Sequence, residues 1–202
     1  VTVSPGQFDA VIAVVGETPY AEGAGDIGSG NLRHTSRYPE DLTVLQKVAG
    51  KGVPVVTLLL SGRPLYANDL LNLSNAFVAG WLPGTEGKGV SDVLFRAANG
   101  AVNKDFKGSL PFSWPKTPCQ FVLNSGDTGY APLFATGYGL HAADVSTVAQ
   151  LDTSVLNCNG NGNTPLAIFN QTDKAPYALY VATAANNWQS VAVGSDLNAT
   201  LN

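Results

Sequence analysis

The chain has 202 residues, of which 45% are hydrophobic and only 13% are charged, and its formal net charge is −4. This composition suits a folded protein of one or two domains and excludes disorder for the bulk of the chain. The basic residues do not cluster, and the longest apolar runs are far shorter than the roughly 20 residues that cross a bilayer, so we expect a soluble protein that binds neither nucleic acid nor a membrane.

Three apolar runs predict buried strands of a mostly parallel sheet: Phe8–Gly16, Val53–Leu60 and Ala76–Trp81. Residues 38–50 begin with Pro and acidic residues and carry apolar residues at helical spacing, so they predict an amphipathic helix. Residues 89–98 predict a second helix, and residues 108–113 a further strand. This order predicts an α/β fold in which helices flank the sheet.

The composition changes beyond Leu140, where Lys174 is the only lysine or arginine. Short apolar runs at residues 165–170 and 177–183 alternate with turn signals and predict antiparallel strands. We therefore predict an α/β domain over residues 1–145 and, over residues 146–202, a β-strand tail or part of a C-terminal β-sandwich module. The chain contains no methionine, and we expect Val1 to lie inside a longer polypeptide.

The two cysteines, Cys119 and Cys158, have no CxxC spacing and no nearby histidine. A zinc site is therefore not expected, and we predict neither a metal nor a cofactor. Two alternatives stay open for the pair. A disulfide requires an oxidising compartment, whereas buried free thiols are ordinary in any compartment.

The loop after the first predicted strand is the place where an open α/β sheet binds ligands. It carries three carboxylates within ten residues, Glu17, Glu22 and Asp26, with Tyr20 between them. Such a loop supplies an acid/base group or binds hydroxyl-rich ligands, and the alternative is a solvated acidic loop. A dinucleotide fingerprint and a GxSxG serine-hydrolase motif are both missing. We interpret His34 and His141, which are isolated, as ordinary loop or surface residues.

Five motifs follow one another in an order and spacing that resemble the second domain of family-three glycoside hydrolases, in the exo-β-glucanase and β-glucosidase branch. They are VVGETPYAEG (14–23), LSGRP (60–64), AGWLPGTEG (79–87), FKGSLPFSWP (106–115) and FATGYGL (134–140). The tail resembles only loosely the additional C-terminal β-module of some bacterial exoglucanases of this family.

The resemblance implies a retaining hydrolase that releases glucose from the non-reducing ends of β-glucans or β-gluco-oligosaccharides. Its two carboxyl groups, a nucleophile and a proton donor, lie about 5–5.5 Å apart. The family's nucleophile is an Asp on a preceding (β/α)8 barrel domain, which we expect as the partner domain outside this chain. The family's proton donor is the second Glu of the first motif, which is Glu22 here.

The other residues of the motifs have weaker assignments. We expect Glu17 to be structural, either turning the loop or pairing with a basic residue such as Arg33 or Arg37. We expect Tyr20 and Asp26 to shape the sugar pocket. Arg63 and Glu86 are interpreted as a strand-end turn and a helix start. Trp81 and Trp114 are expected to pack in the core.

The polymeric substrate implies a periplasmic or secreted enzyme. The alternative is a non-catalytic module that keeps the fold for carbohydrate binding or scaffolding. An upstream barrel with its Asp would favour the enzyme over this alternative.

Overall fold

The computed structural model of the chain describes residues 7–27, 32–154, 158, 178, 180–182 and 188–190. The chain divides into two compact units, Val1–Cys158 and Asn159–Asn202. The predicted boundary at 145/146 lies inside the first unit. Backbone atoms beyond it bind the α/β region, because Asn72 exchanges two hydrogen bonds with Leu151, both 2.9 Å.

A three-stranded parallel sheet in the order β1-β2-β3 forms the centre of the first unit. Its strands are β1 (Val11–Gly16), β2 (Val55–Leu60) and β3 (Ala76–Ala79). In the register of β1 and β2, Val11 faces Val55 and Gly16 faces Leu60. Each of the three apolar runs therefore contains a strand, and the predicted α/β class with a parallel sheet is confirmed.

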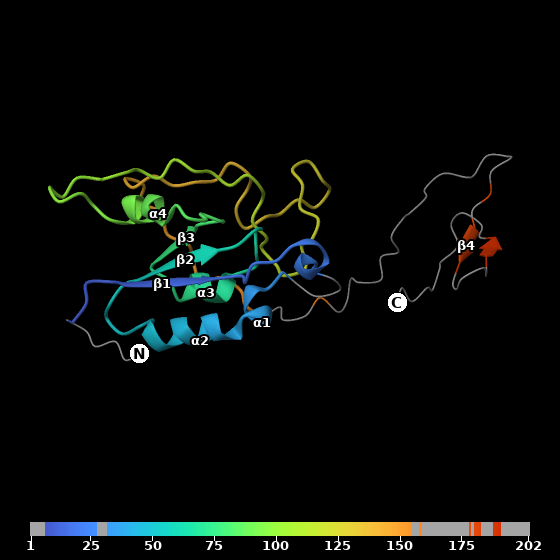
Figure 1. The fold of residues 1–202 in the computed structure, drawn as a ribbon, viewed down its shortest axis with the longest axis horizontal. Helices are drawn as coiled ribbons and strands as arrows, with labels where there is room; N and C mark the ends of the chain where they lie inside the picture. The colour runs from blue at the N-terminus through green and yellow to red at the C-terminus, as the bar shows by residue number, and fades with distance from the viewer. Residues whose placement is uncertain are drawn as a thin grey trace. The chain divides into compact units, whose positions relative to one another are not determined.

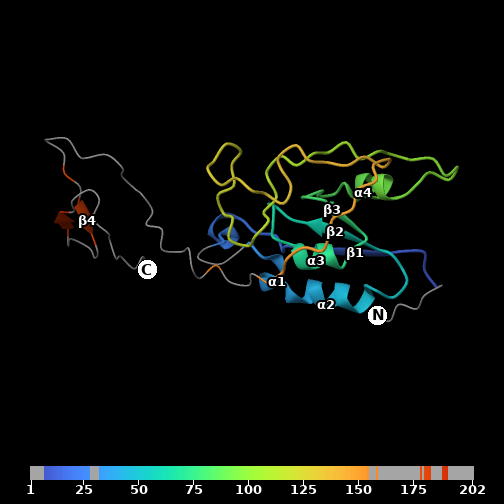
Figure 2. The same ribbon diagram turned by 180° about the vertical axis from the view of Figure 1, so that it is seen from behind.

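Every connection between the parallel strands contains a helix. The helical elements are η1 (Glu22–Gly25), α1 (His34–Arg37), α2 (Pro39–Val48), α3 (Asn68–Asn72) and α4 (Gly87–Leu94). Figure 1 draws α1, α2 and α3 below the strands and α4 above them, next to β3, and Figure 2 shows the same arrangement from behind. Helix α2 confirms the prediction for residues 38–50, whereas the short helices α1 and α3 were not predicted.

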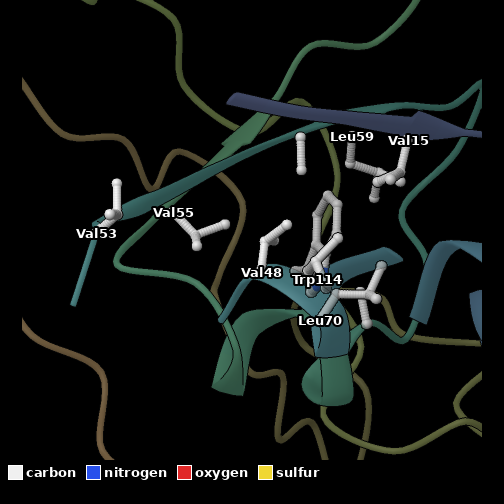
Figure 3. Close-up of a cluster of buried hydrophobic side chains, with 10 residues drawn as sticks. Val15, Val48, Val53, Val55, Leu59, Leu70 and Trp114 are labelled. Atoms are coloured by element: carbon white, nitrogen blue, oxygen red, sulfur yellow. The ribbon is translucent and has the colours of Figure 1, made fainter. Parts of the chain in front are cut away.

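The core lies between the sheet and the helices α2 and α3. Its buried members include Val15 and Leu59 from the strands, Val48 from α2 and Leu70 from α3. Trp114, which is 2% exposed, reaches this cluster from the long segment after α4 (Figure 3). Burial of these side chains fixes one face of β1 and β2 against the helices, since successive strand residues point to opposite faces.

The prediction of a further strand over residues 108–113 is wrong. This segment pairs instead with residues 133–139, through bonds such as Leu110 N–H to the Tyr138 carbonyl and Trp114 N–H to the Phe134 carbonyl, both 2.8 Å. Only an isolated antiparallel bridge between Trp114 and Phe134 results. Pro111 has no N–H to donate to a sheet, which explains why no regular strand forms there.

The cysteine alternatives are settled by a disulfide between Cys119 and Cys158, whose Cα atoms lie 5.4 Å apart. It is contained within the first unit.

In the second unit, β4 (Tyr180–Ala182) pairs antiparallel with β5 (Trp188–Ser190), which confirms an antiparallel strand within residues 177–183. The strand predicted at residues 165–170 lies outside the described residues. None of the helices in the described parts of the chain is long and apolar enough to cross a membrane.

Candidate active site

The loop that follows β1 begins at the carboxyl edge of the sheet, beside the end of β2. The Glu17 N–H donates to the Leu60 carbonyl at 2.9 Å and so continues the pairing of the two strands by one residue. A Cβ at Gly16 would collide with the Leu60 carbonyl oxygen. Glycine therefore allows the two strand ends to approach closely enough for their loops to contact each other.

Glu17 joins these two loops through a buried ion pair. Its side chain is 3% exposed, and its Oε1 lies 3.3 Å from Nε of Arg63. Its Oε2 accepts hydrogen bonds from the Gly62 N–H at 3.2 Å and from the Tyr20 hydroxyl at 3.0 Å. This carboxylate is fully occupied in holding the loop after β1 to the loop after β2.

The predicted partners of Glu17 were wrong. Arg33 forms an ion pair with Asp69 at 2.9 Å, and Arg37 donates to the Asp26 carbonyl at 3.1 Å. Both arginines are close to Glu17 in the sequence, but the parallel pairing of β1 with β2 brings Arg63 to it instead.

Tyr20 lies against the same arginine. The Arg63 guanidinium carbon is 4.3 Å from the centre of the Tyr20 ring, and Arg63 Nε donates to the Tyr20 hydroxyl at 2.9 Å. Burial raises the pKa of the Tyr20 phenol above its usual range, and the hydrogen bond to the Glu17 carboxylate acts in the same direction. The phenol therefore keeps its proton, which it donates to Glu17.

Glu22 is the first residue of η1 and is exposed. Its φ is +48°, in the left-handed region that residues other than glycine rarely adopt. Within the described parts of the chain, the only other non-glycine residue with positive φ is Trp81, two residues after the end of β3, at +51°. Unusual backbone conformations of this kind concentrate at functional sites.

The Glu22 carboxylate forms no hydrogen bond or ion pair with any residue that the structure describes. Asp26, which follows η1, is also exposed, and its N–H closes the short helix by donating to the Gly23 carbonyl at 3.1 Å. The carboxyl edge thus presents Glu22 and Asp26 to solvent, while Glu17 is turned inward.

The remaining predicted residues occupy structural positions. Glu86 directly precedes α4, as expected of a helix start. Trp114 is buried, and Trp81 contacts it edge to face with 6.1 Å between ring centroids. The prediction that both tryptophans pack in the core is therefore confirmed.

A second polar network under the loop was missed. His34, interpreted from the sequence as a surface or loop residue, is 1% exposed, and its Nε2 lies 2.6 Å from Oδ2 of Asp41. The same carboxylate oxygen accepts from the Gly16 N–H at 3.2 Å, and the Tyr38 hydroxyl accepts from the Thr18 N–H at 3.1 Å. His141 is exposed as predicted, with 59% of its side chain accessible.

No cluster of three or more His, Cys, Asp or Glu side chains that could hold a metal ion occurs among the residues with described positions. The polar groups that the structure places at this edge are the carboxylates of the loop, the Arg63 guanidinium and the Tyr20 phenol.

The chain matches the model of the glycosyl hydrolase family 3 C-terminal domain over residues 2–142, which is more than half of its length. It belongs to this family. All five motifs of the sequence analysis fall inside the matched residues, so the resemblance to family-three glycoside hydrolases is confirmed.

Two curated relatives are β-glucosidases by name. The chain is 34% identical over 139 residues to the lysosomal β-glucosidase of Dictyostelium discoideum, a match that covers 65% of this chain and 16% of that protein. It is 32% identical over 157 residues to the periplasmic β-glucosidase of Salmonella typhimurium, covering 66% and 19% respectively. The chain thus spans less than a fifth of the length of either relative.

The solved structures that resemble this family 3 domain include the exo-1,3/1,4-β-glucanase of a Pseudoalteromonas species. A mutant of that enzyme has a TM-score of 0.70 and 48% sequence identity, and the match covers 73% of this chain and 24% of that one. A second structure of that enzyme has the same TM-score and identity, and the match covers 18% of its chain.

The difference in burial between Glu17 and Glu22 leads to a stability prediction. We expect Glu17→Gln to lower the free energy of unfolding by about 2 kcal/mol, because it removes the charge that Arg63 and two hydrogen-bond donors face. The matched control is Glu22→Gln, which changes an exposed carboxylate of the same loop and should leave stability within about 0.5 kcal/mol. Urea unfolding of both variants measures the difference, and equal stability of the two would contradict the buried role of Glu17.

Proposed function

We propose that this chain is part of a retaining, exo-acting β-glucosidase or exo-1,3/1,4-β-glucanase, and that it supplies the acid/base residue Glu22. The nucleophile is an Asp on a (β/α)8 barrel domain of the same enzyme, outside this chain. The observation that carries the proposal is that the two glutamates of the loop differ in burial and in their partners, in a chain that belongs to this family. Glu17 is buried and bound to Arg63, whereas Glu22 is exposed and has no described partner.

This difference makes only one of the two carboxyl groups suitable as a proton donor to a substrate. A proton donor must reach the oxygen of the departing sugar and later take a proton from water, so its carboxyl group must be accessible to a substrate held by another domain. Glu17 accepts two hydrogen bonds and forms an ion pair within its own domain, so both of its carboxylate oxygens already have partners. Glu22 projects from a short helix at the carboxyl edge of the sheet, where a neighbouring domain can approach it.

The proposed substrates are β-glucans and β-gluco-oligosaccharides, cleaved one glucose at a time from the non-reducing end. Asp26 and Tyr20 are our proposed substrate-neighbouring residues, because they flank Glu22 on the same loop. The reaction uses carboxyl groups alone and requires no cofactor. We also propose a periplasmic or secreted location, which agrees with the Cys119–Cys158 disulfide and with the compartments in the names of the two β-glucosidases.

The test is chemical rescue of Glu22→Gly in the complete enzyme. With an aryl β-glucoside whose phenolate departs without protonation, the nucleophile still forms the glycosyl-enzyme, but no base then activates water. Azide needs no base. Its nitrogen attacks the anomeric carbon, the nucleophile's carboxylate departs, and the product is β-glucosyl azide because configuration inverts twice.

We expect azide to raise the turnover of Glu22→Gly and β-glucosyl azide to accumulate. The matched control, Glu17→Gln, should form no glucosyl azide because its acid/base residue is intact. An α-configured azide would overturn the retaining mechanism. Failure of rescue would overturn the role of Glu22, and a complete protein that binds β-glucan without hydrolysing it would favour the non-catalytic carbohydrate-binding module.

A further inference from the structure

Tyr20 is packed between the short helix that begins with Glu22 and the loop that follows β2. A Cβ at Gly25, the last residue of η1, would lie 2.5 Å from Cδ2 of the Tyr20 ring. A Cβ at Gly62 would lie 2.5 Å from the Tyr20 hydroxyl oxygen. Both glycines thus leave space that the tyrosine fills, one from each loop.

The position of this ring is fixed by the charged pair beside it. The Arg63 guanidinium lies over the ring and donates to its hydroxyl, while the hydroxyl donates its single hydrogen to Glu17. The only hydrogen that the phenol can donate is therefore used in a bond within the domain. A side chain held by a cation on its face and by two polar partners at its tip has little rotational freedom left.

Helix η1 depends on a support of this kind. It is a four-residue 3-10 helix, and its N-terminus has no side-chain cap. Its first residue, Glu22, holds a left-handed backbone conformation, which costs a residue with a side chain about 1 kcal/mol or more. A helix this short has little stability of its own. Its buried residue is Gly25, the one that lies against Tyr20.

We propose that Tyr20 is a positioning residue for Glu22: its ring, clamped by Arg63 and Glu17, is the support on which η1 rests. This inference depends on the proposed acid/base role of Glu22. It implies that the buried pair of Glu17 and Arg63 contributes to proton transfer indirectly, by holding Tyr20 and through it the short helix. An error of about 1 Å in the placement of a catalytic group can reduce a rate by roughly a hundredfold.

The test uses Gly25→Ala in the complete enzyme, because the added methyl group displaces the ring from η1 without removing a polar group. We expect kcat/KM, which reports formation of the glycosyl-enzyme, to fall roughly tenfold or more for a glucoside with a poor leaving group and to change far less for an activated aryl glucoside. KM for the glucoside with the poor leaving group should stay within about twofold. The matched control is Gly23→Ala in the same helix, where a Cβ would meet no atom within 4 Å and both rates should be preserved.

Two further variants separate positioning from folding. Tyr20→Phe keeps the ring atoms that contact Gly25 but loses the hydroxyl that bonds to Arg63 and Glu17, so its activity should lie between those of the parent enzyme and Tyr20→Ala. Combining Gly25→Ala with Glu22→Gln should reduce the rate no further than Glu22→Gln alone, since both changes remove the same proton transfer.

The outcomes distinguish this inference from the proposed function. If Glu22→Gln lowers kcat/KM equally for both substrates, the proposed function fails and the inference fails with it. If the effect of Glu22→Gln on kcat/KM is selective for poor leaving groups but Gly25→Ala lowers kcat/KM equally for both substrates, or adds fully to the loss in the double variant, only the inference is overturned. A rise in KM alone would also overturn it, because it would leave contact with the sugar as the only role of Tyr20.

Discussion

Replacement of Glu22 by Gln in the complete enzyme is expected to slow hydrolysis of glucosides with poor leaving groups by roughly a hundredfold or more, the usual contribution of a general acid. An alkyl or sugar oxygen must receive a proton as its bond to the anomeric carbon breaks, whereas a nitrophenolate departs without one. The loss in glucosylation should therefore shrink steadily as the leaving group becomes more acidic. Steady-state kcat/KM across a series of aryl and alkyl β-glucosides measures this dependence.

The same series with Glu17→Gln provides the comparison for Glu22. Its loss should be smaller and should vary less with the acidity of the leaving group, because the Glu17 carboxylate faces Arg63 and Gly62 within its own domain and acts on proton transfer only indirectly, through Tyr20. If the dependence on leaving group appeared in Glu17→Gln and was absent in Glu22→Gln, the two roles would have to be exchanged.

Removal of the disulfide is the second change with a large expected effect. The bridge joins residues separated by 39 positions, and the loop-entropy estimate for a loop of that size is about 4 kcal/mol. Replacing Cys119 and Cys158 together by Ser should therefore lower the free energy of unfolding by about this amount. Both bonded residues lie in the first unit, so the loss should appear in the unfolding of the α/β region.

Urea unfolding monitored by tryptophan fluorescence measures this loss, since Trp114 is buried in the core of that unit. The parent protein with its disulfide reduced should unfold at the same urea concentration as the double Ser variant. An unchanged midpoint in both would contradict the expected stabilisation. Two thiols that react with an alkylating agent in the native, unreduced protein would contradict the bridge itself.

The elements that the sequence predicted best are those whose side-chain pattern reflects burial directly. Strands β1 and β2 are continuous apolar runs because the sheet is parallel, and α2 carries Leu45 and Val48 toward the core at helical spacing. Helix α3 gave no such signal, because two of its buried residues, Asn68 and Asp69, are polar. Their burial is made possible by hydrogen-bond partners from distant parts of the chain, which periodicity cannot reveal.

The same limit explains the errors at the site. The loop and its exposed Glu22 could be located because they follow a recognisable strand. The partner of Glu17 could not, since Arg63 lies in the loop after the next strand and the register of the sheet brings the two side chains together. Asp41 was interpreted only as an acidic residue at a helix start, although it also contacts His34. Asp41 lies at the start of a helix and also contacts His34, and the local sequence pattern predicts only its place in the helix.

The left-handed backbone at Glu22 has a consequence for protein engineering. Glycine adopts that conformation at no steric cost, so a glycine at position 22 is expected to stabilise the fold by about 1 kcal/mol. A directed-evolution screen that rewards heat resistance alone would therefore favour the loss of the proposed proton donor. Screens on the complete protein should therefore link survival to glucose release, its proposed activity, because the backbone at position 22 favours glycine whereas the proposed proton transfer requires glutamate.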